Sequence, residues 1–581
     1  MSDWSGIKAG LQRIYGDSQG DEAFETLLPV LEKYPERKRQ KPDRFSQEDV
    51  VLITYGDSLR KDGQTPLATL REFADEFLSE VVSAIHILPF SPYSSDDGFS
   101  VMDYRRVNPQ LGSWDDIRQL GGRFRLMFDL VLNHVSAQSP WFDRYLQSES
   151  GFESLAIEVD PEADLSKVTR PRALPLLSEF KKSNGQVVHL WTTFSADQID
   201  LNYASPEVLA RMVDVLLFYV EQGAALIRLD AIAYLWKQLG TSCIHLPQTH
   251  EVVRLFRTIL DRIAPDVAIV TETNVPHDEN LSYFGGGRGE AQMVYNFTLP
   301  PLLLYTFVQE DAGALARWAA TLQLESPENA FFNFTASHDG IGVRPLEGIL
   351  PRNEIDRLVE RVKANGGQVS TKRNPDGSES PYELNITYLD ALADPRRGEE
   401  DPWLARRFLA SQAIQMALPG VPGIYMHSLL GSRNWTEGVR QTGRARTINR
   451  EKLQDEQVRA ELATPGSFRS KVFSRYCTLL AVRRRQPAFH PNAAFEVLDA
   501  GPAVFAILRT SAEQRLCAVT NVTSRPVAVS LRDCRGAGPS VDLLGQGALK
   551  VERLELEPYQ TAWITDAGSS WEQGSEAGSP K

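Results

Sequence analysis

Short apolar runs alternate with amphipathic stretches along the chain from about residue 47 to about residue 430. The runs are rich in Val, Ile and Leu, whereas the stretches between them carry apolar residues at the spacing of an α-helix. Such alternation is typical of βα units that build a parallel sheet, so the pattern predicts an α/β fold. The eight predicted strands are 50–55, 84–89, 125–130, 225–230, 267–272, 292–296, 330–335 and 423–425.

Several predicted strands end in a polar or charged residue at the point where the apolar character stops. Asp129 lies in the third strand, and His134 follows it closely. Asp230 and Glu272 end the next two strands, and Asp339 follows the seventh. Eight βα units with carboxylates at the carboxyl ends of the strands are typical of a (β/α)8 barrel, whose active site lies at that end. The sequence therefore predicts a (β/α)8 TIM barrel.

Other segments are added to this barrel. The intervals at about 136–203 and 340–392 are too long for simple loops and predict two inserted subdomains on the active-site face. After about residue 486, short alternating runs separated by turn residues predict a C-terminal β-sandwich. The predicted organisation is an N-terminal helical extension at 1–48, a catalytic barrel at 49–486, the β-sandwich at 487–566 and a disordered tail at 567–581.

The composition excludes several classes of protein. Hydrophobic residues make up 42% of the 581 residues and charged residues 24%, which is the balance of a globular chain with large cores. The formal net charge of −14, without a basic stripe, disfavours nucleic acid as a partner. Neither a signal sequence nor an apolar stretch long enough to span a membrane is present, so we expect a cytoplasmic protein.

The cysteines predict neither a disulfide framework nor a metal site. They are far apart and lack the close Cys or His spacing of metal ligands. We therefore expect reduced thiols, no bound metal and no cofactor. The four residues are Cys243, Cys477, Cys517 and Cys534.

Four motifs follow one another in order at the predicted strand ends: DLVLNH (129–134), IRLDAIAY (227–234), VTETN (270–274) and ASHD (336–339). Together they resemble the conserved regions of the α-amylase superfamily of retaining α-glycosidases. Further segments, among them HILPFSPYSSDDGF, LPGVPGIYM and INR, resemble sucrose phosphorylase and its close relatives. The resemblance implies transfer of an α-glucosyl unit to inorganic phosphate through a covalent glucosyl-enzyme, with retention, which yields α-D-glucose 1-phosphate.

Asp230 and Glu272 match the two carboxyl groups of a retaining enzyme. One is ionised and attacks the anomeric carbon, and the other is protonated and donates its proton to the leaving oxygen. Arg228, two residues before Asp230, is expected to depress the pKa of Asp230, whereas partial desolvation is expected to raise the pKa of Glu272. The alternative is structural: an ion pair between Asp230 and Arg228, and a helix cap at Glu272.

The resemblance also implies which residues hold the glucosyl unit. Asp339 matches the third carboxylate, which binds glucose hydroxyls more strongly as oxocarbenium character develops. Asp96 matches a glucose-binding aspartate, and the adjacent Asp97 is the other candidate for this role. For the aromatic residues, the alternative to sugar binding is plain core packing. The other residues matched to the glucose site are Phe99, His134, Phe194, Tyr234, His338 and Arg446.

A phosphorylase must let phosphate outcompete water, which requires a local cationic site in this acidic protein. Arg172, in the first insertion, matches the phosphate-handling arginine of the family, and Arg170 is its neighbouring rival. Tyr382, in the second insertion, matches a tyrosine on the family's mobile loop. The alternative for both arginines is a solvated loop charge.

Two positions on the acceptor side depart from the pattern of sucrose-specific members. Asn274 stands where those members carry histidine, and Glu383 stands where they carry glutamine. The surrounding sequence is closer to relatives that act on sucrose 6′-phosphate or glucosylglycerate, but Glu383 would repel an anionic acceptor unless cations outweigh it. We therefore expect sucrose first, with glucosylglycerol, glucosylglycerate and sucrose 6′-phosphate as alternatives.

Two other functions stay open on this basis. An α-glucosidase or transglucosidase would use the same carboxylates with water or a sugar, but Arg172 and the insertions disfavour it. A catalytically silent binding module is disfavoured by the intact Asp230, Glu272 and Asp339. The expected partners are a small α-glucoside and inorganic phosphate, and the sequence allows either a monomer or a homodimer.

Overall fold

A closed barrel of eight parallel strands forms the centre of the molecule. The strands follow the order β1-β16-β12-β11-β10-β9-β4-β3, and each neighbouring pair is parallel. The predicted (β/α)8 TIM barrel is therefore confirmed. The structure, a computed structural model, describes residues 4–40, 43–172, 174–287, 289–374, 378–398, 401–532, 534, 540–545, 548–549 and 552–566.

The barrel strands are buried on both faces, which explains their almost continuous apolar sequences. Every residue of β1, β3 and β10, for example, is buried. All eight predicted strands are barrel strands, and their predicted limits agree with the observed ones to within two residues. The strands are β1 (Val51–Thr54), β3 (Ala84–Ile87), β4 (Arg125–Leu130), β9 (Ala224–Leu229), β10 (Ala268–Thr271), β11 (Met293–Tyr295), β12 (Ala330–Phe334) and β16 (Val421–Tyr425).

Amphipathic helices connect the strands and turn their apolar sides inward. In α7, for example, Val252, Phe256 and Ile259 are buried at helical spacing. Two short strands, β2 (Leu59–Arg60) and β17 (Leu453–Gln454), pair outside the barrel. The helices are α3 (Pro66–Phe77), α4 (Trp114–Gly121), α6 (Pro206–Glu221), α7 (Pro247–Ile263), α8 (His277–Leu281), α9 (Leu299–Gln309), α10 (Gly313–Ala319), α13 (Leu404–Ala417), α14 (Met426–Leu429), α15 (Thr436–Thr442), α16 (Asp455–Ala463) and α17 (Phe468–Arg484).

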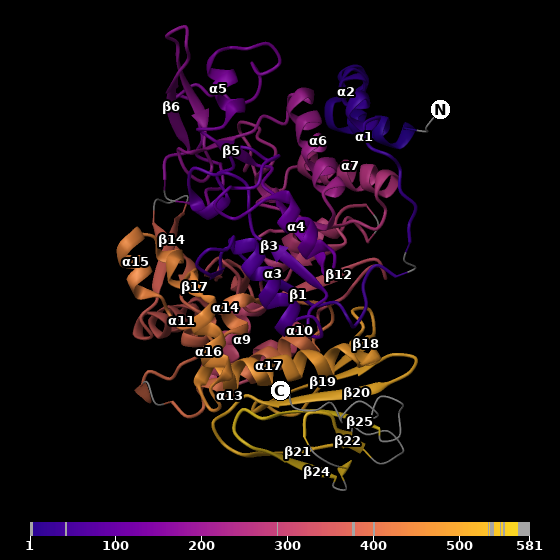
Figure 1. Cartoon of the computed structure of the whole chain (residues 1–581), viewed down its shortest axis with the longest axis vertical. Coiled ribbons are helices and arrows are strands. Elements are labelled where there is room, and N and C mark those ends of the chain that lie inside the picture. The colour runs from indigo at the N-terminus through magenta and orange to yellow at the C-terminus, as the bar shows by residue number, and fades with distance from the viewer. Residues whose placement is uncertain are drawn as a thin grey trace.

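Two long segments leave the barrel after β4 and after β12, where the sequence predicted insertions. In the first, β5 pairs with β8 and β6 pairs with β7; the second carries a three-stranded sheet in the order β13-β15-β14. Figure 1 shows β14 beside the first segment. The elements are β5 (His134–Ser136), α5 (Pro140–Leu146), β6 (Leu177–Lys181), β7 (Val187–Trp191) and β8 (Gln198–Asp200), then β13 (Ile341–Gly342), α11 (Arg352–Ala364), β14 (Gln368–Arg373), β15 (Glu379–Asn385) and α12 (Tyr388–Ala391).

The N-terminal helices α1 (Ser5–Tyr15) and α2 (Asp17–Leu31) dock on the barrel helices. Helix α1 packs against α7 and α2 packs against α6, at the end of the molecule opposite the C-terminal strands (Figure 1). Leu11 and Leu27 are buried in this contact. The hydroxyl of Tyr15 donates to the backbone carbonyl of Tyr203 at 2.8 Å.

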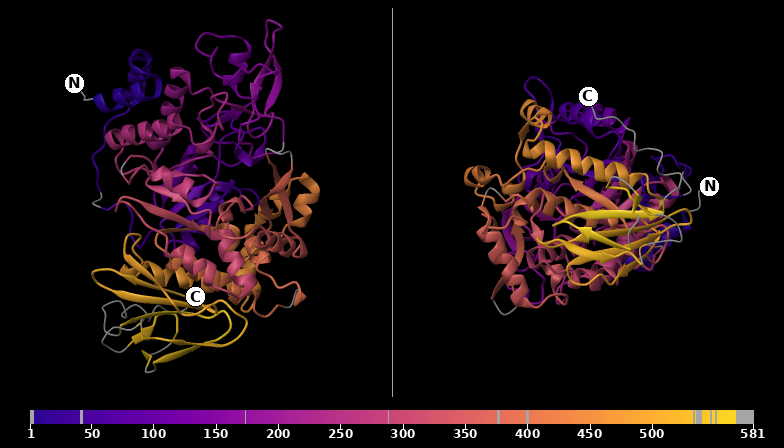
Figure 2. Two further views of the ribbon diagram at one scale, coloured as in Figure 1. Left: turned by 180° about the vertical axis from the view of Figure 1, so that it is seen from behind. Right: turned by 90° about the horizontal axis from the view of Figure 1, so that it is seen from below.

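Two stacked sheets follow α17 and form the other end of the molecule, as Figure 2 shows from two sides. Side chains of β19 alternate between two cores: Phe505 and Ile507 belong to the core shared with the barrel, whereas Ala506 and Leu508 belong to a core between the sheets. The predicted C-terminal β-sandwich is therefore present. Its strands are β18 (Ala494–Leu498), β19 (Val504–Thr510), β20 (Arg515–Asn521), β21 (Val527–Ser530), β22 (Ser540–Asp542), β23 (Ala548–Leu549), β24 (Arg553–Leu556) and β25 (Thr561–Asp566).

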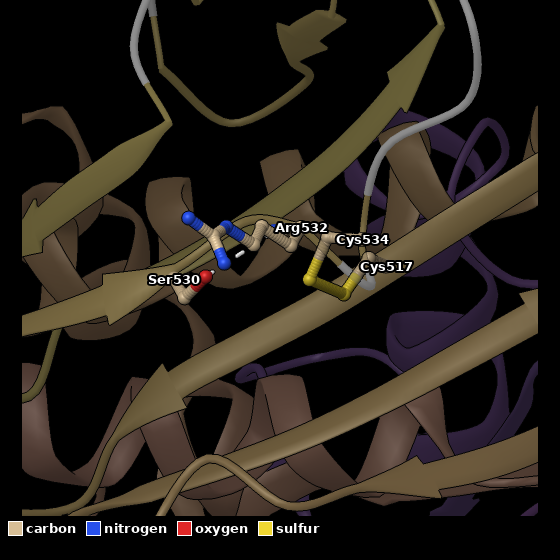
Figure 3. The surroundings of a disulfide bond; sticks show 4 residues. All are labelled: Cys517, Ser530, Arg532 and Cys534. Carbon is tan, nitrogen blue, oxygen red and sulfur yellow. Dashed lines mark hydrogen bonds between the residues drawn. A yellow bond between two sulfur atoms is a disulfide. The ribbon is translucent and has the colours of Figure 1, made fainter.

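A disulfide joins Cys517 on β20 to Cys534, which follows β21; Figure 3 shows it beside Ser530 and Arg532. The prediction of four reduced thiols is wrong for this pair, whereas Cys243 and Cys477 are free. The paired residues are 17 positions apart in sequence, and stacking of the two sheets places their Cα atoms 5.1 Å apart. Sequence spacing alone carries no sign of such a tertiary contact.

The domain limits drawn from the sequence stay a prediction. The predicted disordered tail at 567–581 lies outside the described residues. Within the described part of the chain, no helix combines the length and the apolar character needed to cross a lipid bilayer.

We expect Leu11→Ala to destabilise the protein by about 2–5 kcal/mol, because it leaves a cavity where α1 meets the barrel helices. Thermal unfolding and hydrogen exchange of α1 and α2 measure the effect. The matched control is Lys8→Ala, which removes a partly exposed ion pair with Asp21 and a cation–π contact with Phe24 but leaves no core cavity. If the two variants show equal stability and equal exchange, the docking of α1 contributes nothing to the fold.

Candidate active site

The polar ends of the barrel strands converge on one pocket. Asp230 directly follows β9, Glu272 directly follows β10, and Asp339 lies in the turn after β12. Among the described residues, no group of three His, Cys, Asp or Glu side chains is placed to hold a metal ion. All residues predicted for the site line this pocket: Asp96, Phe99, His134, Arg172, Phe194, Arg228, Asp230, Tyr234, Glu272, Asn274, His338, Asp339, Tyr382, Glu383 and Arg446.

Arg228 brings together the two carboxyl groups considered for catalysis. Its Nη1 donates to Asp230 Oδ1 at 2.8 Å, and its Nη2 lies 3.8 Å from Glu272 Oε2. The same guanidinium donates to Asp129 on β4. The backbone N–H of Ala231 donates to Glu272 Oε2 at 2.9 Å. The two carboxyl groups therefore approach one guanidinium from adjacent strands.

Burial raises the pKa of both carboxyl groups. Desolvation raises the pKa of Asp230 to about 7 and that of Glu272 to about 7, although Arg228 lowers each. The expected rise for Glu272 is therefore found, whereas the expected depression for Asp230 is wrong because desolvation outweighs the ion pair. Hydrogen bonds favour the ionised form of each group, because Arg228 donates to Asp230 and the backbone N–H of Ala231 donates to Glu272, so the pair exchanges a proton near neutral pH.

A second arginine holds Asp339. Arg446 Nη1 lies 2.7 Å from Asp339 Oδ1, and the same guanidinium makes two hydrogen bonds to Glu383, at 3.0 and 2.9 Å. Burial alone would raise the pKa of Asp339, but Arg446 and neighbouring positive groups hold it well below its ordinary value. Asp339 is therefore ionised, and Arg446 connects it to Glu383 across the pocket.

The loop after β3 turns sharply to present Asp96. Asp96 and Asp97 adopt positive φ angles of 54° and 49°, a strained conformation for residues other than glycine. Asp96 lines the pocket, whereas Asp97 pairs with Arg450 at 2.5 Å. Arg450 Nε also donates to the backbone carbonyl of His338 at 2.7 Å, so it ties this loop to the turn that carries Asp339. Of the two candidates, Asp96 therefore lies in the pocket, whereas Asp97 is engaged by Arg450 outside it.

Two neutral histidines and three aromatic rings form another part of the wall. Burial lowers the pKa of His338 to about 3 and also lowers the pKa of His134. His338 stacks on Phe99 with ring centroids 4.8 Å apart, and Phe194 meets Tyr234 edge to face at 5.7 Å. Such a wall offers apolar ring faces together with neutral hydrogen-bonding groups, which suits a sugar.

Sequence reasoning missed residues that support the site from behind. His86 Nε2 lies 2.7 Å from Asp129 Oδ2, and the buried Lys237 pairs with Asp200 at 2.5 Å. Both are ionisable residues next to apolar runs, in AIHIL and AYLWK, which is the signal that could have found them. The pocket is also lined by residues that were not predicted from the sequence: Gln198, Ala231, Ala233, Thr273, Val275, Phe297 and Gly340.

Arg172 and Tyr382 reach the pocket from the two insertions. Arg172 lines it without an ion pair to any described carboxylate, whereas Arg170 donates to the carbonyl of Leu174 and does not line it. Burial raises the pKa of Tyr382, so its hydroxyl is uncharged. Among the described groups, Asn274 Oδ1 is buried without a hydrogen-bond partner. An arginine and a carboxamide are therefore available to a ligand on this side of the pocket.

The barrel, the paired carboxyl groups and the third, arginine-held carboxylate are those of an enzyme that processes glycosides. Residues 77–340 match the family described as alpha amylase, catalytic domain. The chain is 54% identical over 519 residues to a glucosylglycerate phosphorylase of Spirochaeta thermophila, with 88% of each chain covered. It is 34% identical over 474 residues to a sucrose phosphorylase of Agrobacterium vitis, covering 78% of this chain and 90% of that protein.

The fold comparison agrees with the sequence comparison. The crystal structure of sucrose 6F-phosphate phosphorylase from Thermoanaerobacter thermosaccharolyticum matches with a TM-score of 0.71 at 27% identity, covering 82% of this chain and 94% of that one. The chain belongs to the glycoside phosphorylases of the α-amylase family, which are glycosyltransferases.

We expect kcat/KM for an α-glucoside to fall about tenfold per pH unit above neutrality, because Glu272 loses the proton that the leaving oxygen needs. The sign follows from the raised pKa of Glu272, about 7, since the protonated form is the active one. α-Glucosyl fluoride, whose leaving group needs no proton, should lack this decline. Steady-state rates for both donors across the neutral to alkaline range test this, and the same decline with both would contradict it.

Proposed function

We propose that the protein is a glucosylglycerate phosphorylase. It converts glucosylglycerate and inorganic phosphate into α-D-glucose 1-phosphate and glycerate, with retention at the anomeric carbon. The relative at 54% identity that bears this name supports the choice of acceptor. The structural observation that carries the acceptor assignment is the ion pair between Glu383 and Arg446, because it weakens the repulsion between Glu383 and an anionic acceptor.

In the first step, Asp230 attacks the anomeric carbon while Glu272 gives its proton to the oxygen of the leaving glycerate. The bond from the anomeric carbon to glycerate breaks, and a bond to the Asp230 carboxylate forms. Arg228 favours the ionised form of Asp230 through its hydrogen bond at 2.8 Å. Asp339 binds glucose hydroxyls more strongly as positive charge develops on the ring, which lowers the barrier.

In the second step, a phosphate oxygen attacks the same carbon and displaces Asp230. Hydrogen phosphate gives its proton to Glu272, which restores the acid for the next cycle. Arg172 is the phosphate ligand in this proposal, because its guanidinium faces the pocket without a carboxylate partner among the described residues. Tyr382 and the other residues of the insertions cover the site against water, which would otherwise compete.

Sucrose, the first expectation from the sequence, is not supported. That expectation rested on repulsion between Glu383 and an anionic acceptor. Glu383 is 3% exposed, accepts two hydrogen bonds from Arg446 and a third from the backbone N–H of Gly340 at 3.1 Å. Arg446 shares its positive charge between Glu383 and Asp339, so the charge of Glu383 is partly offset and repels a carboxylate less than an unpaired Glu383 would. Asn274, with its unpartnered carboxamide oxygen, is the group proposed to bind a glycerate hydroxyl.

We expect phosphate-dependent formation of α-D-glucose 1-phosphate to be about tenfold or more faster, as kcat/KM, from glucosylglycerate than from glucosylglycerol, sucrose or sucrose 6′-phosphate. The reason is that glucosylglycerate alone among the four donors carries a carboxylate, which Arg172 attracts and which the partly offset charge of Glu383 repels only weakly. The four donors are compared in parallel, with Asp230→Asn as the inactive control. A preference for sucrose would contradict the acceptor assignment, and equal glucose release without phosphate would contradict the phosphorylase.

We expect Arg172→Ala to raise the KM for phosphate by about tenfold or more, because a charge-assisted hydrogen bond is lost. Hydrolysis of the same donor in phosphate-free buffer should change much less, since water needs no cation. The matched control is Arg118→Ala on α4, which removes an exposed ion pair with Asp115. An unchanged KM for phosphate would exclude Arg172 as the phosphate ligand.

A further inference from the structure

A second cavity adjoins the active pocket, and we call it the antechamber. Tyr234 and Tyr382 line both cavities and form the partition between them. The antechamber lies between the first insertion and the strands of the second, where Figure 1 shows β14 beside the first insertion. Its charged lining residues are Lys167, Arg170, Arg344 and Lys372.

The antechamber is cationic, although the chain as a whole carries a net charge of −14. No aspartate or glutamate occurs among its described lining residues. Arg344 lies 3.6 Å from Glu279 and Lys372 lies 3.1 Å from Glu347, but neither glutamate lines the cavity. Both glutamates therefore lie outside the space that a ligand would occupy, and the described charged residues that line this space are all positive.

The active pocket has the opposite balance. Its described lining holds five carboxyl groups and three arginines, so an anion that approaches from solvent meets net negative charge. One positive group of the antechamber, Arg344, acts on the partition. Burial raises the pKa of Tyr234 to about 12, and Arg344 is the strongest influence that opposes this rise. Arg344 therefore acts on the partition itself, at the boundary between the antechamber and the active pocket.

We propose that the antechamber binds small oxyanions, carboxylate or phosphate, and passes them to the active pocket. The inference rests on the proposed function, in which the donor, glycerate, phosphate and glucose 1-phosphate all carry negative charge. A cationic cavity with low-dielectric walls raises the local concentration of such anions and speeds their entry. Movement of Tyr382 opens the passage, because this side chain belongs to both cavities.

The test compares two triple variants that change the net charge equally. The antechamber variant is Lys167→Gln, Arg344→Gln and Lys372→Gln. The control variant is Lys33→Gln, Arg118→Gln and Lys363→Gln, whose side chains pair with Asp214, Asp115 and Glu360 and do not line the antechamber. The donor is α-glucosyl fluoride, which is neutral, so any dependence on anions comes from the acceptor.

At low ionic strength we expect kcat/KM for inorganic phosphate to fall about tenfold in the antechamber variant, together with a loss of its salt dependence. The control variant should keep both properties. Transfer to glycerate should fall in the same way, whereas transfer to glycerol, the neutral analogue, should not. A loss confined to phosphate or to glycerate supports the site and identifies which oxyanion it takes.

Equal rates and equal salt dependence in the two variants would overturn the proposal. So would a parallel loss in phosphate-free hydrolysis of the fluoride, because that loss would come from a damaged glucose site. If the unmodified enzyme formed no glucose 1-phosphate at any phosphate concentration, the proposed function would fail. The glycerate and glycerol arms would still decide whether the antechamber selects anions.

Discussion

The buried guanidinium of Arg228 is the interaction on which the rest of the site depends. Arg228 is 1% exposed, yet its guanidinium donates to Asp129 and Asp230 and lies near Glu272. A cation is tolerated at such a position only when carboxylates compensate it, and breaking a buried set of this kind costs about 3–5 kcal/mol. His86 extends the set, so four adjacent barrel strands, β3, β4, β9 and β10, fix the geometry.

The remaining charges of the pocket follow from this arrangement. The carboxylates that line the pocket would repel one another without further cations, and Arg446 and Arg450 supply them. Arg446 joins Asp339 to Glu383 of the second insertion, while Arg450 joins the Asp97 loop to the carbonyl of His338. The barrel therefore holds the central carboxyl groups, and Arg446 connects them electrostatically to the second insertion.

Much of the fold was predictable because parallel strands buried on both faces leave a strong apolar signal, as in VLIT and AIVT. Asp230 and Glu272 were predictable because each interrupts that signal at a strand end. The contacts that the sequence did not predict are tertiary contacts. The Cys517–Cys534 disulfide and the compensation of Glu383 by Arg446 join positions that no local pattern relates. The pKa of Asp230 depends on the extent of its burial, which a strand-end position does not reveal.

The most direct test of the account is to locate the glucosyl unit on the enzyme. In Glu272→Gln, α-glucosyl fluoride can still glucosylate the nucleophile, but water lacks a base to remove the sugar. Peptide mass spectrometry without phosphate should then find one glucosyl adduct, on the peptide that contains Asp230. Added phosphate should discharge it as α-D-glucose 1-phosphate. An adduct on another carboxylate, or turnover without any adduct, would contradict the double displacement at Asp230.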